Sequence, residues 1–92
     1  MKIDGSLMGD LAKAGKGAKR LESIGFDGAI TAETSHDPFF PLLLASQETE
    51  NIELVTSIAV AFSRTPMNLA NIGHDLNSFS KGRFVLGLGS QI

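Results

Sequence analysis

Residues 52–60, with the sequence Ile-Glu-Leu-Val-Thr-Ser-Ile-Ala-Val, decide the fold class of this chain. Only Glu53, Thr56 and Ser57 are polar, and the other residues are aliphatic. Dense runs of isoleucine, leucine and valine are enriched in strands, because they pack well on a pleated surface. The stretch therefore predicts a buried β-strand, and the elements on either side of it indicate the kind of sheet to which it belongs.

A helix and a further strand follow this central strand. Thr65-Pro66 is a good helix start, because threonine can accept from a free N–H group and proline at the first helical position has no N–H to lose. Residues at intervals of three or four then form one apolar helical face: Leu69, Ile72, Leu76 and Phe79. After the turn at residues 80–82, Phe84 to Leu88 forms another apolar strand.

The same alternation precedes the central strand. Asp37-Pro38 repeats the combination of cap and proline, and the strongly apolar segment from Phe39 to Thr49 is predicted to be a helix. Phe26 to Ala32 is a short apolar run that indicates a buried strand.

The first strand and helix complete the pattern. Lys2 to Met8 is predicted to form a strand, and residues 11–24 an amphipathic helix that ends at Gly25. Asp10 is the expected N-cap of this helix. Two glycines inside it each cost about 0.5 to 1 kcal/mol relative to alanine, so the helix must depend on tertiary packing.

The predicted elements form a βα repeat. Its strands begin near residues 2, 26, 52 and 83, and a helix follows each strand except the last. Such a repeat implies parallel strands with right-handed crossovers, in an open doubly wound sheet or in a (β/α)8 barrel. A barrel needs roughly 200 to 250 residues. We therefore expect residues 1–92 to be an α/β unit, the amino-terminal portion of a TIM barrel truncated after its fourth strand.

Composition excludes several function classes. The chain is 42% apolar and 20% charged, which is typical of a folded globular protein, and its net charge of -2 argues against nucleic acid or an anionic membrane surface as a partner. The absence of cysteine removes thiolate metal sites and fits the reducing cytoplasm. His36 and His74 are too few for a zinc site built from protein alone, so no metal is expected.

In either parallel fold, reactive groups gather at the carboxyl ends of the strands. The loop Glu33-Thr34-Ser35-His36-Asp37 follows the second strand, and His36 could exchange a proton near neutral pH. The alternative is that Asp37 only caps a helix and His36 is an exposed loop residue. The residues alone favour this alternative.

Two other strand ends carry candidate residues. In Thr56-Ser57-Ile58-Ala59 the hydroxyl groups either bond locally or face a polar ligand. Gly87-Leu88-Gly89-Ser90 fails as a dinucleotide fingerprint, because Ile92 stands where the third glycine belongs. Its glycines fit close approach to a flat ring or a tight barrel corner. Arg64 could contact a phosphate or a carboxylate, although a structural role is commoner at a helix entry.

Four stretches in order, residues 21–27, 33–38, 55–60 and 82–89, together resemble the amino-terminal third of bacterial luciferase-like flavin monooxygenases, and among these the branch of coenzyme F420-dependent oxidoreductases. The resemblance covers essentially all 92 residues. Its most specific parts are the third strand followed by Arg64-Thr65-Pro66, and the sequence Gly-Arg-Phe-Val-Leu-Gly-Leu-Gly at residues 82–89.

The resemblance implies a barrel, usually dimeric, that carries coenzyme F420 or, alternatively, FMN across the carboxyl ends of its strands and transfers hydride to or from a small organic substrate. It implies that the Ser57-Ile58 peptide bond is cis and supports one face of the ring. His36 would be the catalytic proton donor, and Ser35, Ser90 and Gln91 would contact the cofactor.

Three residues depart from the family pattern. Ser35 replaces an acid that F420-dependent relatives often carry, and Val60 lacks a hydroxyl that some relatives offer to the cofactor. Ile92 stands where some members place a carboxylate, which argues against the glucose-6-phosphate branch.

Two alternatives to this hypothesis stay open. One is a non-catalytic truncated half-barrel that associates with itself or with another chain. The other is a flavodoxin-like binding domain with the same βα repeat.

Overall fold

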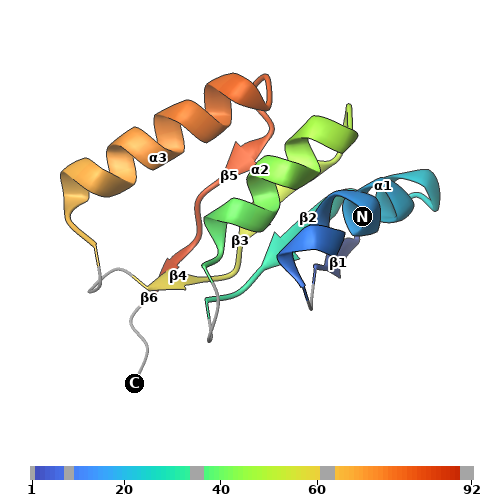
Figure 1. Cartoon of the computed structure of the whole chain (residues 1–92), viewed down its shortest axis with the longest axis horizontal. Coiled ribbons are helices and arrows are strands. Elements are labelled where there is room, and N and C mark those ends of the chain that lie inside the picture. The colour runs from blue at the N-terminus through green and yellow to red at the C-terminus, as the bar shows by residue number, and fades with distance from the viewer. Residues whose placement is uncertain (1, 8–9, 34–36, 61–63, 90–92) are drawn as a thin grey trace.

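The computed structural model describes residues 2–7, 10–33, 37–60 and 64–89, and Figure 1 shows the arrangement of their helices and strands. In chain order, the elements are β1 (Asp4–Ser6), the 3-10 helix η1 (Leu11–Lys13), α1 (Ala14–Ser23), β2 (Gly28–Thr31), α2 (Phe39–Glu48), β3 (Glu53–Thr56), β4 (Ala59–Val60), α3 (Pro66–Phe79), β5 (Phe84–Val85) and β6 (Leu88–Gly89).

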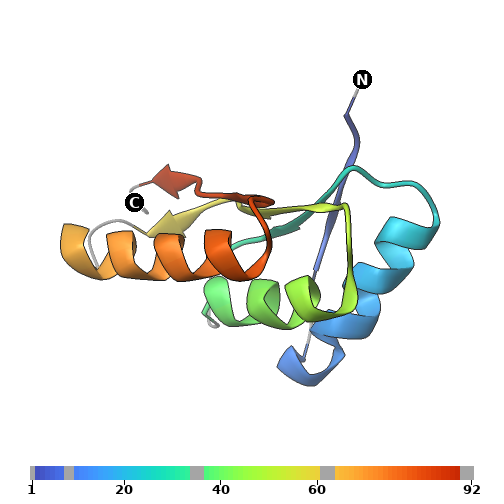
Figure 2. The same cartoon turned by 90° about the horizontal axis from the view of Figure 1, so that it is seen from above.

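The strands form a parallel sheet with the order β1-β2-β3-β5, and β4 and β6 form a second parallel pair beyond β3 and β5. Figure 2 shows all three α-helices on one side of the sheet. A flavodoxin-like sheet carries helices on both faces and reverses its strand order, whereas successive strands with an outer helix layer are the arrangement of a barrel. The α/β class with parallel strands is confirmed, and the flavodoxin-like alternative is wrong.

The main core lies between the sheet and helices α1 and α2. The register of the strands places Gly5, Ala29, Leu54 and Phe84 side by side on the face that the helices cover. The buried residues of this core are Ala18, Ala29, Leu42, Ala45, Ile52 and Leu54. A second cluster, which packs α2 and α3 together, consists of Phe39, Ala59, Leu69 and Leu76.

The opposite face of the sheet carries no helix among the described residues (Figure 2). Ile30, Val55 and Val85 are register partners on β2, β3 and β5, so they form an apolar row across this face. Ile30 and Val55 are half-buried, and Val85 is exposed.

The predicted strands over residues 52–60 and 84–88 are each interrupted. β3 stops at Thr56 and β4 starts at Ala59, and the peptide bond between Ser57 and Ile58 is cis, as the family resemblance implied. The hydroxyl of Thr56 donates to the carbonyl of Gly87 (2.9 Å) and accepts from its N–H (2.8 Å). The carbonyl of Gly87 also accepts from the N–H of Ala59 (2.8 Å), so the Thr56 hydroxyl occupies the Gly87 N–H at the point between the β3–β5 pair and the β4–β6 pair.

The ends of the helices follow the predictions except at one residue. The Asp37 carboxylate accepts from the N–H groups of Phe39 and Phe40 (both 2.7 Å), and the Thr65 hydroxyl accepts from the N–H of Asn68 (3.0 Å). Asp10 stands at the N-cap position of η1, as predicted, but its side chain makes no capping hydrogen bond. A 3-10 turn precedes α1 instead, in which the Asp10 carbonyl accepts from the N–H of Lys13.

Helices α1, α2 and α3 contain 10, 10 and 14 residues. A bilayer crossing takes about 20 apolar residues. In the described part of the chain, no helix reaches the length and apolar character of a membrane span.

Candidate functional site

The carboxyl ends of β2, β4 and β6 lie at the same edge of the structure, where parallel strands place their reactive groups (Figure 1). Ser57 and Ile58 follow β3 at this edge. The N–H of Ser57 donates to the carbonyl of Thr31 (2.5 Å), and the carbonyl of Ile58 accepts from the N–H of Glu33 (3.1 Å). Both residues of the cis bond are thus tied to the end of β2.

The side chains of Ser57 and Ile58 are open to solvent in the described structure, and Ile58 is 40% exposed. On the neighbouring strand, a Cβ atom added to Gly89 would overlap the Cδ1 atom of Ile58. A Cβ atom on Gly87 would overlap the carbonyl oxygen of Thr56. Both glycines therefore permit close packing between strands, which agrees with a tight barrel corner.

An ion-pair network occupies the same edge. Arg64 Nη1 lies 2.5 Å from Glu33 Oε1, and Arg64 Nη2 lies 3.4 Å from Asp37 Oδ1. The side chains of Arg64 and Glu33 are 13% and 18% exposed, so the pair is largely shielded from water. The Arg64 guanidinium also lies over the ring of Phe39, with its central carbon 4.9 Å from the ring centroid.

The network holds both partners in their charged forms. The hydrogen bond from Arg64 lowers the pKa of Glu33, and its effect, together with the bond from the Val60 N–H, outweighs burial. The reciprocal hydrogen bond raises the pKa of Arg64. Glu33 is a carboxylate at neutral pH and is poorly suited to donate a proton there. Arg64 is bound within the protein rather than held ready for a phosphate.

The pair of Glu33 and Arg64 is the feature of this site that the sequence did not predict. The two residues are 31 positions apart, so no local pattern links them. The available signal was their position, because Glu33 follows the second strand and Arg64 follows the third. Parallel neighbouring strands bring such residues to the same edge.

Most of the predicted site lies outside the described residues. Ser35, His36, Ser90 and Gln91 all belong to this group, so the roles of the proton donor and of three cofactor contacts stay predictions. In the described ranges, no group of three acidic or histidine side chains could hold a metal ion. His74, the other histidine of the chain, is exposed on α3.

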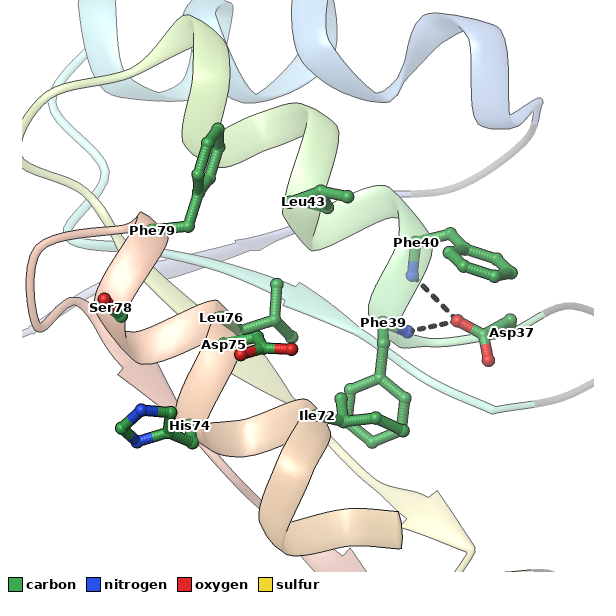
Figure 3. Close-up of a pocket in the computed structure, with 10 residues that line it drawn as sticks. All are labelled: Asp37, Phe39, Phe40, Leu43, Ile72, His74, Asp75, Leu76, Ser78 and Phe79. Atoms are coloured by element: carbon green, nitrogen blue, oxygen red, sulfur yellow. Dashed lines mark hydrogen bonds between the residues drawn. The ribbon is translucent and has the colours of Figure 1, made fainter.

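A groove with a volume of about 580 Å³ runs between α2 and α3 (Figure 3). Its walls are mainly apolar, with Phe40, Leu43 and Phe79 among the lining residues. Neither Ser57 nor Ile58 lines it. Because the groove lies between the outer helices rather than at the strand ends, we do not place the chemistry there.

A second polar cluster lies at the opposite end of the strands. The Glu22 carboxylate accepts from the N–H groups of residues 50, 51 and 52. Burial works to raise the pKa of Glu22, but these bonds together lower it. Arg83 donates to the carbonyls of Ser46, Thr49 and Ile52. This cluster joins loops at the amino ends of the strands, where polar residues contribute to stability.

Comparison with known proteins relates the chain and its fold to one family. The family model of luciferase-like monooxygenases matches residues 2–92. An uncharacterized protein of Mycobacterium tuberculosis is 59% identical over 92 residues, which cover all of this chain and 27% of that protein. A putative coenzyme F420-dependent oxidoreductase of the same organism is 38% identical over 69 residues, covering 74% of this chain and 20% of that protein.

Two solved structures share the fold over the whole chain. The oxygenating constituent of 3,6-diketocamphane monooxygenase from Pseudomonas putida, in complex with FMN, has a TM-score of 0.88 at 21% identity, with 30% of its chain covered. The coenzyme F420-dependent tetrahydromethanopterin reductase from Methanopyrus kandleri has a TM-score of 0.86 at 24% identity, with 27% covered. The chain thus spans less than a third of these proteins, and its fold is that of part of a luciferase-like barrel.

Proposed function

Because the chain belongs to the luciferase-like monooxygenase family, we propose that it forms part of an oxidoreductase that transfers hydride between coenzyme F420 and a small organic substrate. FMN is the alternative cofactor. Both cofactors appear among the similar proteins, F420 in the name of the Mycobacterium tuberculosis oxidoreductase and FMN in the Pseudomonas putida structure. Self-association as a dimer and a cytoplasmic location are part of the same proposal.

One observation carries this proposal: Ser57 and Ile58 form an exposed segment at the carboxyl end of β3, with its backbone bonded to Thr31 and Glu33. An aliphatic side chain on a fixed backbone suits contact with the face of a flat ring. The residues present therefore fit a flavin or deazaflavin, and Ser57 and Ile58 would hold it. When bound, the ring supplies the hydride-transfer chemistry, while the protein supplies binding and orientation.

The charged state of Glu33 indicates that this residue and His36 have different roles. Glu33 is held as a carboxylate by Arg64, so it stabilises the strand ends and does not release a proton. A proton for the substrate has to come from a group that titrates near neutral pH, and histidine has that property. We therefore retain His36 as the proposed proton donor, with Ser35, Ser90 and Gln91 as proposed cofactor contacts.

Cofactor retention tests the proposal. The chain is incubated with F420 or FMN and desalted, and the absorbance of the protein fraction is measured. We expect a retained chromophore. Ile58→Glu should weaken binding about tenfold or more, because it puts a charge against the ring. The matched control is Ile24→Glu, which alters a 62% exposed isoleucine just after α1 and should leave binding unchanged.

Two results would contradict this function. Wild-type protein at micromolar concentration that retains neither chromophore would overturn cofactor binding by the chain. Equal affinity in the Ile58→Glu and Ile24→Glu variants would remove the Ser57–Ile58 segment from the cofactor site.

A second candidate function is a non-catalytic half-barrel that associates with itself or with another chain. The apolar row of Ile30, Val55 and Val85 on the helix-free face favours it, because such a surface gains stability when covered. An assembly larger than the monomer that retains no chromophore would support this function over the first.

A further inference from the structure

Arg64 contacts both ends of a short connection. Glu33 and Asp37 flank residues 34–36, and the two terminal nitrogens of the same guanidinium reach one carboxylate each, at 2.5 Å and 3.4 Å. Only three residues separate these anchors. A single planar cation therefore joins Glu33, which follows β2, to Asp37, which precedes α2.

The same network extends to the Ser57–Ile58 segment, which is proposed to contact the cofactor ring. Arg64 Nη1 donates to the carbonyl of Val60 (3.1 Å), and the N–H of Val60 donates to Glu33 Oε1 (2.7 Å). The N–H of Glu33 donates in turn to the carbonyl of Ile58 (3.1 Å). Arg64 and Glu33 thus join β4 and the Ser57–Ile58 segment to the end of β2.

The surroundings make this network rigid. The Arg64 side chain lies on the ring of Phe39 and is 13% exposed, so bulk salt screens its charge only weakly. The second oxygen of Asp37 caps α2, which holds that carboxylate in place. Lysine could replace the charge of Arg64 but not the planar fork that reaches several acceptors at once.

We infer that Arg64 is a positioning residue, which holds the Ser57–Ile58 segment and β4 in place against the end of β2 and the start of α2. This inference rests on the proposed function, because it assigns the Ser57–Ile58 segment to the cofactor site. Arg64 acts through Glu33, Asp37 and Val60 and needs no contact with the cofactor itself.

Two substitutions test this role against one control. Arg64→Met removes the network, and Arg64→Lys restores the charge alone. Arg83→Lys is the control, because Arg83 is similarly bonded but lies at the amino ends of the strands. Urea unfolding measures the stability of each variant. A loss of cofactor affinity can then be compared with the loss of stability in the same variant.

The first measurement is titration of each full-length variant with F420 and with FMN. We expect Arg64→Met to weaken binding of the retained cofactor about tenfold or more, since small misplacements of site groups have effects of this size. Arg64→Lys should recover part of the affinity. Arg83→Lys should bind as the wild type does, even where its urea midpoint falls. Equal losses in Arg64→Met and Arg83→Lys would overturn the positioning role, as would unchanged affinity in Arg64→Met.

The second measurement needs no cofactor. In amide spectra of the free protein, Arg64→Met should shift the signals of Glu33 and Asp37 together with those of residues 57–60, and Arg83→Lys should leave both groups in place. Absence of a shift in either group would overturn the inference. If the wild type binds neither cofactor, the proposed function fails, and these spectra still decide whether Arg64 couples the two segments.

Discussion

At the scale of single residues, Glu33 links protein stability to pH. Its pKa is lowered in the folded protein from the ordinary 4.5, chiefly by the hydrogen bond from Arg64. A carboxyl group whose pKa is lower in the folded state adds stability above its unfolded pKa and loses it as the pH falls through the folded value. The stability that Glu33 contributes should therefore be complete above about pH 4.5 and decline below it.

Glu33→Gln tests this linkage. At pH 7 we expect the free energy of unfolding to fall by about 1.5–3 kcal/mol, the range for hydrogen bonds to charged groups. Between pH 5 and pH 3 the variant should lose stability less steeply than the wild type. Some loss should remain, because the pKa of Glu22 is also lowered. Urea unfolding at each pH measures both effects.

Glu53→Gln is the control for this experiment. Glu53 pairs with Lys2 on the surface, where the lysine side chain is 72% exposed, and such pairs contribute about 0–1 kcal/mol. The Glu33 assignment is contradicted if wild type and Glu33→Gln lose stability equally between pH 5 and pH 3.

At the scale of elements, the break between β5 and β6 depends on a glycine. The backbone of Gly87 bonds to the Thr56 hydroxyl, and a Cβ atom at this position would overlap the carbonyl oxygen of Thr56. Because a backbone atom of the neighbouring strand cannot move aside alone, Gly87→Ala should destabilise the fold by about 2–3 kcal/mol.

Gly17→Ala is the matched substitution. Gly17 lies inside α1, and an added Cβ atom there would contact only the Leu7 Cδ2 atom, at 3.4 Å. Alanine is a better helix former than glycine, so we expect a gain of about 0.5–1 kcal/mol. Urea unfolding of both variants gives the comparison, and Gly87→Ala with wild-type stability would contradict the close approach of Gly87 to the Thr56 backbone.

At the scale of the whole molecule, the described helices cover one face of the sheet and leave the other to solvent (Figure 2). The apolar row of Ile30, Val55 and Val85 crosses that open face, and β1 and β5 are the outer strands of the four-stranded sheet. Exposed apolar patches and unpaired strand edges promote association.

We therefore predict that the isolated chain self-associates. Light scattering should give a mass that rises above 9.7 kDa with protein concentration. Val85→Lys should reduce this association, whereas Met67→Lys, which alters an exposed residue on α3, should not. A mass of one chain at every concentration would contradict the prediction.

The local chemistry of the chain was sufficient to predict most elements. Asp37 and Thr65 cap their helices, and Gly25 follows α1 with a positive φ, as their residue types indicated. These features depend on neighbours within a few positions, which is why periodicity and capping residues reveal them. Asp10 is the exception, because a 3-10 turn uses its carbonyl rather than its side chain.

By itself, the sequence determined the alternation of strands and helices, the parallel sheet and the family. Only the tertiary structure decided that the helices share one face, that the Thr56 hydroxyl bonds to the backbone of Gly87, and that Arg64 joins Glu33 to Asp37. The physical reason is distance along the chain. Contacts between residues about 30 positions apart depend on strand register and on which side each crossover packs, and no local pattern encodes either.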